Sequence, residues 1–274
     1  MASTQPWTWK ISQERPFLTC DLLPVAHGFF TSPFYPDGPE ELVAVLNADS
    51  DSKVSVHRVK QVHSADVLTP TEIDRAIAAG LPELEDGNPS PFPLADGVTS
   101  DRLGQSVWAC SADCTPALIA DVKTGRVAAV HAGWRGTAQK ILPAAVLKLQ
   151  EQGSQLADLR IALGPAIAGK VYQVKREVAA EVGATVLPVG RGFSDDEMVD
   201  FLLTIDDSPL LNDAEENRVR LDVRQINQMQ LVQMGLALEQ IAIAPHCTYQ
   251  EPERFFSYRR THEKKVQWSG IISQ

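Results

Sequence analysis

The sequence predicts an α+β fold in one domain that spans residues 1–274. Apolar, β-branched segments typical of strands are mixed with segments of helical periodicity. The two kinds do not alternate as they do in a βαβ protein. The chain has 274 residues, 44% of them hydrophobic, which is enough to bury one large core or two moderate ones. No internal repeat or clear domain boundary divides it.

Strands are expected where β-branched and apolar residues are bounded by turn-forming residues. This pattern is found at residues 53–59, 106–110, 116–122, 126–132, 159–164 and 240–245.

The first expected helix covers residues 137–153. Thr137 is placed to cap its first turn, and Gly153 ends the pattern. Pro143 lacks the amide hydrogen that a helix interior needs, so it must lie in the first turns or kink the helix.

Two further helices are expected at 175–183 and 223–235, the second with Asp222 as its cap. The proline-rich stretch 80–97 predicts a surface loop. The acidic, turn-rich stretch 190–218 predicts a surface insertion.

Charge and composition limit the partners. The net charge is −10, which opposes binding to nucleic acid or to an anionic membrane. No secretory leader and no run of about 18 apolar residues occurs, so a cytoplasmic location is expected. Four scattered cysteines do not suggest a disulfide framework. A monomer or a small homo-oligomer is expected.

Three side chains that can bind a metal stand where apolar segments meet turns: His63, Cys114 and His131. Two imidazoles and one thiolate suit zinc and leave the fourth tetrahedral position open, as in catalytic sites. Because the three are widely spaced, the pattern alone also allows two hydrogen-bonded core histidines and a small buried cysteine.

The stretch VAAVHAGWRG, residues 127–136, changes from an apolar strand to a polar loop at His131. Gly133 and Gly136 remove side chains where a ligand would approach the backbone. Arg135 provides a planar donor fork for phosphate beside an expected helix N-terminus. Trp134 is either an apolar wall of the pocket or ordinary core.

These motifs resemble one bacterial family along about 47–260. The matching segments are QVHSADV, ADGVTSD, ADCTPALIAD, VAAVHAGWRGT, GPAI, YQV, HCTY and FFSYRR. The family is that of the laccase-domain or polyphenol oxidase proteins, of peptidoglycan-editing-factor type, described as purine nucleoside phosphorylases with adenosine deaminase activity. The resemblance implies zinc bound by His63, Cys114 and His131. It also implies a layered sandwich of mixed β-sheets with covering helices, similar to the catalytic domain of cytotoxic necrotising toxins.

With this resemblance, purine nucleosides and phosphate become the expected substrates. Contacts to substrate are expected from Asn47, Gly133, Arg135, Gly164 and Tyr172.

Two further residues are expected near the ligands. Asp113 is expected to act as an acid or base or to orient a zinc ligand, although an aspartate that caps a turn is equally ordinary. Cys247 is expected to pack near the pocket.

In the segment 164–171, GPAIAGKV, Val171 stands where a phosphate-binding P-loop has Ser or Thr, so nucleotide hydrolysis of that type is not expected.

Other chemistries remain open. Cys114 with His131 is also the pair that a cysteine hydrolase would use, including one that edits a peptidoglycan precursor. A copper-dependent polyphenol oxidase is disfavoured because the chain has only six histidines, and a binding module because a structural zinc site would be closed by protein. Ser32 and Gln173 depart from the family pattern and put anion contacts in doubt.

Overall fold

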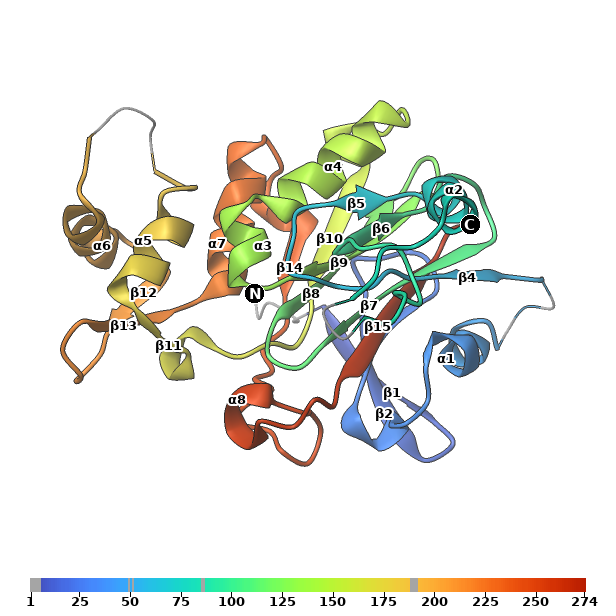
Figure 1. Cartoon of the computed structure of the whole chain (residues 1–274), viewed down its shortest axis with the longest axis horizontal. Helices are drawn as coiled ribbons and strands as arrows, with labels where there is room; N and C mark the ends of the chain where they lie inside the picture. The colour runs from blue at the N-terminus through green and yellow to red at the C-terminus, as the bar shows by residue number, and fades with distance from the viewer. Residues whose placement is uncertain (1–5, 49, 51, 85–86, 188–191) are drawn as a thin grey trace.

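The computed structural model describes residues 6–48, 50, 52–84, 87–187 and 192–274. Figure 1 shows its strands, which are β1 Trp7–Ser12, β2 Arg15–Cys20, β3 His27–Phe30, β4 Ser55–His57, β5 Val67–Leu68, β6 Gly97–Thr99, β7 Gln105–Ser111, β8 Thr115–Asp121, β9 Val127–Ala132, β10 Leu159–Leu163, β11 Gln173–Lys175, β12 Leu210–Asn212, β13 Arg218–Leu221, β14 Ile241–Ile243 and β15 Gln267–Ile272. The helices are α1 Pro39–Leu46, α2 Pro70–Ala79, α3 Trp134–Ala138, α4 Ile141–Glu151, α5 Arg176–Gly183, α6 Asp195–Thr204, α7 Val223–Gln233 and α8 Tyr258–Thr261. Short 3-10 helices are η1 Ser32–Phe34, η2 Leu156–Asp158, η3 Gly169–Val171 and η4 Leu238–Gln240.

Two sheets pack face to face and form the body of the molecule. The first sheet has the order β1-β2-β3-β15-β7-β4, and the second has the order β14-β10-β8-β9-β6-β5. Helix α1 covers the outer face of the first sheet, and α4 with α7 covers the outer face of the second. The expected α+β sandwich of mixed sheets with covering helices is therefore confirmed.

Strands β8 and β9 form an antiparallel hairpin at the centre of the second sheet. Alternate side chains of a strand point to opposite faces. Leu118 and Ala120 accordingly pack between the two sheets, whereas Ala117 and Ile119 pack against the helices. Because both faces are covered, the hairpin is apolar almost throughout, and its ends hold the polar residues.

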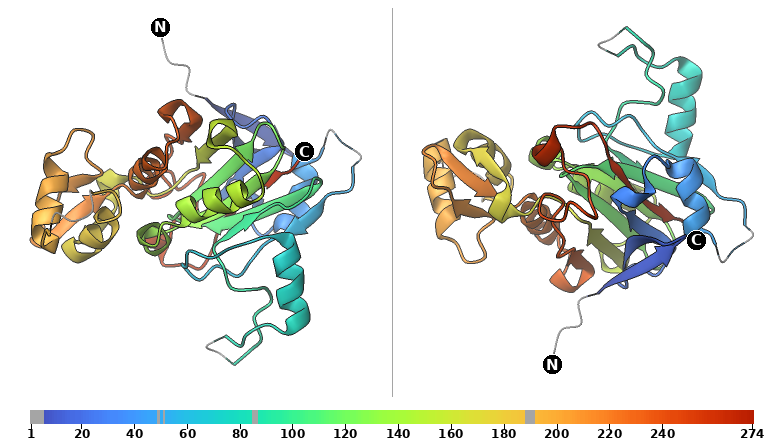
Figure 2. Two further views of the ribbon diagram at one scale, coloured as in Figure 1. Left: turned by 90° about the horizontal axis from the view of Figure 1, so that it is seen from above. Right: turned by 90° about the horizontal axis from the view of Figure 1, so that it is seen from below.

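A third, smaller sheet of order β11-β13-β12 stands to one side of the body (Figure 2). Helices α5 and α6 pack on it and share a separate core with it, and we call this part the lobe, residues 173–187 and 192–221. Val199, Leu202 and Leu210 are buried in that core. The lobe core continues into α7 through Val223 and Ile226, so the lobe is attached to the helical face of the body.

The six strands expected from the sequence are confirmed as β4, β7, β8, β9, β10 and β14. The expected helices at 175–183 and 223–235 are confirmed as α5 and α7, and Asp222 caps α7 by accepting hydrogen bonds from the amides of Arg224 and Gln225. The described part of the stretch 80–97 contains no helix and only short pairing before β6, as expected of a loop.

The expected helix at 137–153 is instead two helices, α3 and α4. Gly133, not Thr137, is the cap residue of α3, and Lys140 adopts a left-handed conformation with φ of 61° between the two. Thr137 is buried and hydrogen-bonds through its hydroxyl to Asn227. Pro143 lies in the first turn of α4, where its missing amide hydrogen costs nothing.

The prediction of a surface insertion at 190–218 is wrong for the part that the structure describes, residues 192–218. This part folds into α6 and β12 and contributes Val199, Leu202 and Leu210 to the lobe core. On α6 the acidic side chains are exposed, and Asp196 and Asp200 pair with Arg176 of α5, whereas Val199 and Leu202 are buried. Within the described residues, no helix has the length and apolar character needed to cross a membrane.

Candidate metal centre

The hairpin places two of the three expected ligands at its open end. Cys114 immediately precedes β8, and His131 is the next-to-last residue of β9. Thr115 pairs with Ala132 and Pro116 with His131, so the two ligands lie close together across the hairpin. The antiparallel register alone therefore joins a cysteine and a histidine that are far apart in sequence.

A loop brings the third ligand, His63, to the same place. Gln61 anchors this loop to β7, because its side-chain amide donates to the carbonyl of Cys110 and its oxygen accepts from the Cys110 amide, each at 2.8 Å. The Asp96 carboxylate accepts from the amides of Val62 at 3.0 Å and Ser64 at 2.7 Å, on either side of His63. His63 itself has a left-handed φ of 63°, which the bonds on both sides hold in place.

The same carboxylate orients His131. Asp96 is 1% exposed, and its Oδ1 atom lies 2.8 Å from His131 Nδ1. A carboxylate at Nδ1 fixes the tautomer and leaves Nε2 to bind a metal. Asp96 therefore positions two of the three ligands, and the reasoning from residue types did not single it out. The only indication was the segment ADGVTSD, which entered through the family resemblance.

The donor atoms of His63, Cys114 and His131 all lie within 4.8 Å of one another. We call these three residues the candidate metal centre. A side chain on Gly133 would leave no room for this arrangement, because its Cβ would lie 2.9 Å from Cys114 Sγ and 3.2 Å from the His63 ring. Two imidazoles, one thiolate and a glycine that permits their approach fit a zinc ion with one open position.

Charges inside the candidate metal centre favour the thiolate. Burial alone would raise the pKa of Cys114, but the charge and hydrogen bonds of His131 and His63 outweigh burial and lower the pKa to about 6. Burial would lower the pKa of His131, yet Cys114 and Asp96 raise it to about 10. The thiolate is the form that binds a metal and also the form that attacks as a nucleophile.

A small recess of about 30 Å³ lies beside the ligands. Cys114 and Gly133 form one side of it, and Trp134, Ile167 and Tyr172 form another. Burial raises the pKa of Tyr172 to about 12, so its hydroxyl stays neutral and can donate a hydrogen bond. The recess holds one or two groups of the size of water, so only one end of a larger molecule can enter it.

Trp134 has both of the roles considered from the sequence, since it lines the recess and also packs against the lobe core. Arg135 follows it on α3 and is exposed. The Arg135 guanidinium carbon lies 4.4 Å from the centroid of the Trp134 ring. This stacking holds a cation beside Trp134, a residue of the recess wall, although Arg135 itself does not line the recess.

Asp113 lines the recess as well, but both of its carboxylate oxygens are engaged by residues other than the candidate ligands. It accepts hydrogen bonds at 2.7 Å from the Thr248 hydroxyl and from the backbone amide of Arg259. Asp113, which directly precedes Cys114, thus links this end of β8 to α8. The contact to a ligand imidazole belongs to Asp96 instead.

The structure does not bring two of the expected substrate contacts to the recess. Asn47 follows α1 on the outer side of the first sheet, and its side chain donates to the carbonyls of Ser50 and Ser52 in its own loop. Gly164 follows β10, and a Cβ there would lie 2.3 Å from the Phe29 ring. Close packing between the sheets accounts for that glycine.

Cys247 and His246 also have structural partners. The buried Cys247 thiol accepts from the Ala168 amide at 3.3 Å, which agrees with the expected packing role. His246, its neighbour in the sequence, does not line the recess either. Its ring contacts Glu251 at 2.9 Å and packs against Trp9.

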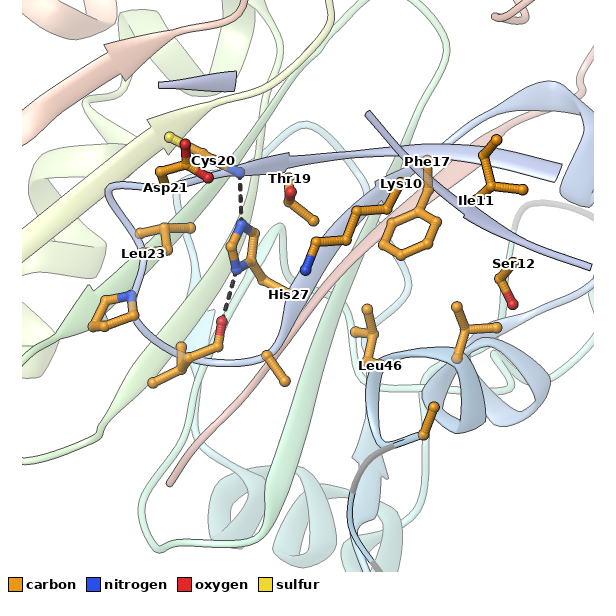
Figure 3. A pocket seen from close by; sticks show the side chains of 15 residues that line it. Lys10, Ile11, Ser12, Phe17, Thr19, Cys20, Asp21, Leu23, His27 and Leu46 are labelled. Carbon is orange, nitrogen blue, oxygen red and sulfur yellow. Dashed lines mark hydrogen bonds between the residues drawn. The ribbon is translucent and has the colours of Figure 1, made fainter. Parts of the chain in front are cut away.

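A larger recess of about 510 Å³ lies between α1 and the strands β1, β2 and β3 (Figure 3). It contains no residue of the candidate metal centre. His27 lines it with both ring nitrogens engaged: Nε2 accepts from the Cys20 amide at 2.8 Å, and Nδ1 donates to the Val25 carbonyl at 2.7 Å. Size therefore does not identify the reactive site in this molecule.

Known proteins share this sequence and fold. The chain is 52% identical over 268 residues to a purine nucleoside phosphorylase of Synechocystis sp., and the match covers 97% of each chain. It is 28% identical over 219 residues to an adenosine deaminase from an unknown prokaryotic organism, which covers 80% of this chain and 74% of that protein.

The crystal structure of YlmD from Geobacillus stearothermophilus has the same fold, with a TM-score of 0.71 at 23% identity, over 97% of this chain and 98% of that one. Residues 40–273 match one family along nearly the whole sandwich and lobe. With the close relative from Synechocystis, this match confirms the resemblance noted in the sequence. The chain belongs to the family described as multi-copper polyphenol oxidoreductase laccase.

Proposed function

We propose that the protein is a zinc-dependent purine nucleoside phosphorylase. Its substrates would be adenosine, inosine and methylthioadenosine, with adenosine deamination as a second reaction. The convergence of His63, Cys114 and His131 beside an open recess is the observation that carries the proposal. The similarity to a purine nucleoside phosphorylase and to an adenosine deaminase supports it.

In phosphorolysis, a phosphate oxygen attacks C1′ of the ribose. The bond from C1′ to the purine nitrogen breaks, its electron pair leaves with the base, and the base takes up a proton. Arg135, stacked on the Trp134 ring of the recess wall, would bind the attacking phosphate with its donor fork. The neutral Tyr172 hydroxyl would donate a hydrogen bond to the bound nucleoside. A zinc ion in the candidate metal centre would supply a Lewis acid at the inner end of the recess.

The histidines argue against a site with several coppers. All six histidines lie in the described residues, and only His63 and His131 gather in a cluster of potential ligands. A multicopper oxidase needs many imidazoles at neighbouring positions. The family description is therefore not a guide to the chemistry that this geometry favours.

A cysteine hydrolase is the alternative that one observation favours. Cys114, His131 and Asp96 are arranged as the nucleophile, base and orienting carboxylate of such an enzyme would be. Such an enzyme would have no need for His63, whose imidazole points to the same centre. A hydrolase of this kind should keep its activity in a chelator and lose it to iodoacetamide, whereas chelation should inactivate the zinc enzyme.

The test combines metal analysis with product analysis. Protein purified without added metal should contain close to one zinc per chain, and should form ribose 1-phosphate from nucleosides only when phosphate is present. Replacing His63, Cys114 or His131 by Ala should remove both the zinc and the activity. Full metal occupancy in all three variants would contradict the site.

A further inference from the structure

Another recess, of about 340 Å³, opens beside the one at the candidate metal centre. We call it the cationic recess. It is lined by side chains from four separate parts of the chain, namely Lys170, Gln173, Asp213, Arg220, Tyr249 and Arg259. Nothing in the phosphorolysis proposed above uses Lys170, Arg220 or Tyr249.

The charge in the cationic recess is positive although the whole chain carries −10. Asp213 is its acidic residue, and Arg220 already neutralises it, with the guanidinium Nε 2.8 Å from the carboxylate. The same guanidinium donates to the Lys170 carbonyl at 2.6 Å, which fixes the backbone that carries Lys170. Lys170 and Arg259 thus remain as two cations in excess, and within the described residues no acidic partner contacts the Lys170 ammonium.

The cationic recess shares a wall with the recess at the candidate metal centre. Tyr172 lines the recess at the candidate metal centre, which we call the inner recess, and its neighbour Gln173 lines the cationic recess. Arg259 lies over the Tyr172 ring, its guanidinium carbon 4.9 Å from the ring centroid, and it donates to the Gln173 carbonyl at 3.0 Å. The Asp113 carboxylate, next to Cys114, holds the Arg259 backbone at 2.7 Å.

The sizes of the two recesses indicate where a substrate would extend. The inner recess of about 30 Å³ holds only the reacting end of a nucleoside, so the rest of a larger substrate must lie outside it. The cationic recess of about 340 Å³ offers that space. It is lined by cations and by the partly exposed Tyr249 ring.

We propose that the cationic recess is an anion subsite that binds a phosphoryl group, with Lys170 and Arg259 as its principal contacts. The inference rests on the proposed function, because it assigns a substrate group to the space next to that reaction. A phosphoryl group could come from inorganic phosphate or from a phosphate carried on the nucleoside, and both present the same oxygen atoms to the two cations.

Direct binding tests the proposal without any turnover. Inorganic phosphate and adenosine 5′-monophosphate are each titrated into the zinc-loaded full chain and followed by ³¹P NMR. Lys170→Gln removes one cation from an exposed side chain, so the fold is preserved. Lys53→Gln, at an exposed lysine two residues before β4, removes the same charge elsewhere. Strand β4 lies at the end of the molecule opposite to the lobe (Figure 1).

We expect Lys170→Gln to weaken binding about fivefold, the effect of one cation near the surface, and Lys53→Gln to leave it unchanged. Weakening confined to inorganic phosphate would identify the co-substrate as the source. Weakening confined to the monophosphate would identify a phosphate carried by the nucleoside. Arg259→Gln should act in the same direction on the same ligand.

Unchanged affinity for both ligands in Lys170→Gln, or equal weakening in Lys53→Gln, would overturn the subsite. The proposed function fails by a different result: no ribose 1-phosphate from zinc-loaded wild-type protein with nucleoside and phosphate. Since the titration needs no reaction, the two failures are distinguishable.

Discussion

Asp96 is a single carboxylate that positions two of the candidate metal ligands. One oxygen orients the His131 imidazole, and the other accepts the amides on both sides of His63. Asp96→Asn keeps the size but places an amide where a carboxylate is needed. We expect its zinc affinity to fall by about 10- to 100-fold, the usual cost of losing a carboxylate that supports a ligand. Competition with a chromophoric chelator measures the change.

Asp113→Asn is the matched control, because Asp113 precedes a ligand but contacts Thr248 and Arg259 rather than an imidazole. Its zinc affinity should stay near that of the wild type. Equal losses in the two variants would mean that any carboxylate near Cys114 supports the metal.

Arg135 is exposed and, among the described residues, its guanidinium contacts the Trp134 ring, so its substitution should leave the fold intact. Arg135→Met should reduce phosphorolysis by about 1.5–3 kcal/mol of transition-state stabilisation, the range for hydrogen bonds to a charged group. Deamination of adenosine needs no phosphate and should persist. Chromatography of the products from adenosine, with and without phosphate, separates the two reactions. An equal loss of both, with zinc retained, would show a general role for Arg135 in the pocket.

At the scale of elements, strand positions were predictable and loop positions were not. The apolar runs that became β8 and β9 are each buried on both faces, so their composition alone marks them. The break between α3 and α4 depends on Lys140 in a left-handed conformation, which no local preference of lysine predicts. The place of His63 depends on Asp96, 33 residues later, and only the folded sheets bring the two together.

Helix α7 begins at a cap that also contacts another element. Asp222 accepts from the amides of Arg224 and Gln225, and its carboxylate accepts from the Gly169 amide at 3.3 Å. Asp222→Ala should therefore lower the free energy of unfolding by about 1–2 kcal/mol, the cost of a lost helix cap. Asp206→Ala, at an exposed aspartate in the turn after α6, should change it by less than about 0.5 kcal/mol. Urea denaturation of both variants measures the difference, and equal stabilities would refute the capping role.

At the scale of the whole molecule, the ligands and the wall of the recess belong to different cores. The candidate metal centre stands on the sandwich, whereas Trp134 and Tyr172 pack against the lobe core. Leu202→Ala in the lobe should cost about 2–5 kcal/mol and loosen that wall. We expect zinc content to be retained and KM for nucleosides to rise. Hydrogen exchange should increase mainly in residues 173–187 and 192–221.

Leu149→Ala on α4 removes the same atoms from the core under β9. It should loosen the second sheet and lower metal occupancy at elevated temperature, which Leu202→Ala should not do. The same pattern of exchange and metal loss in both variants would mean that the two cores unfold as one unit.

The hairpin of β8 and β9 has its chain reversal at one end and Cys114 and His131 at the other. An ion bound to both residues would cross-link the two strands at the end opposite to the turn and so close the hairpin into a loop. The strands could then no longer separate from their free end, and opening would have to begin at the turn around residues 122–126. Since an unfolded chain cannot gather these donors, zinc at a hundred times its dissociation constant would add about 2.7 kcal/mol to the free energy of unfolding. The candidate metal centre would thus also stabilise the sandwich. A chelator would then lower the melting temperature of the protein as well as stop its reaction.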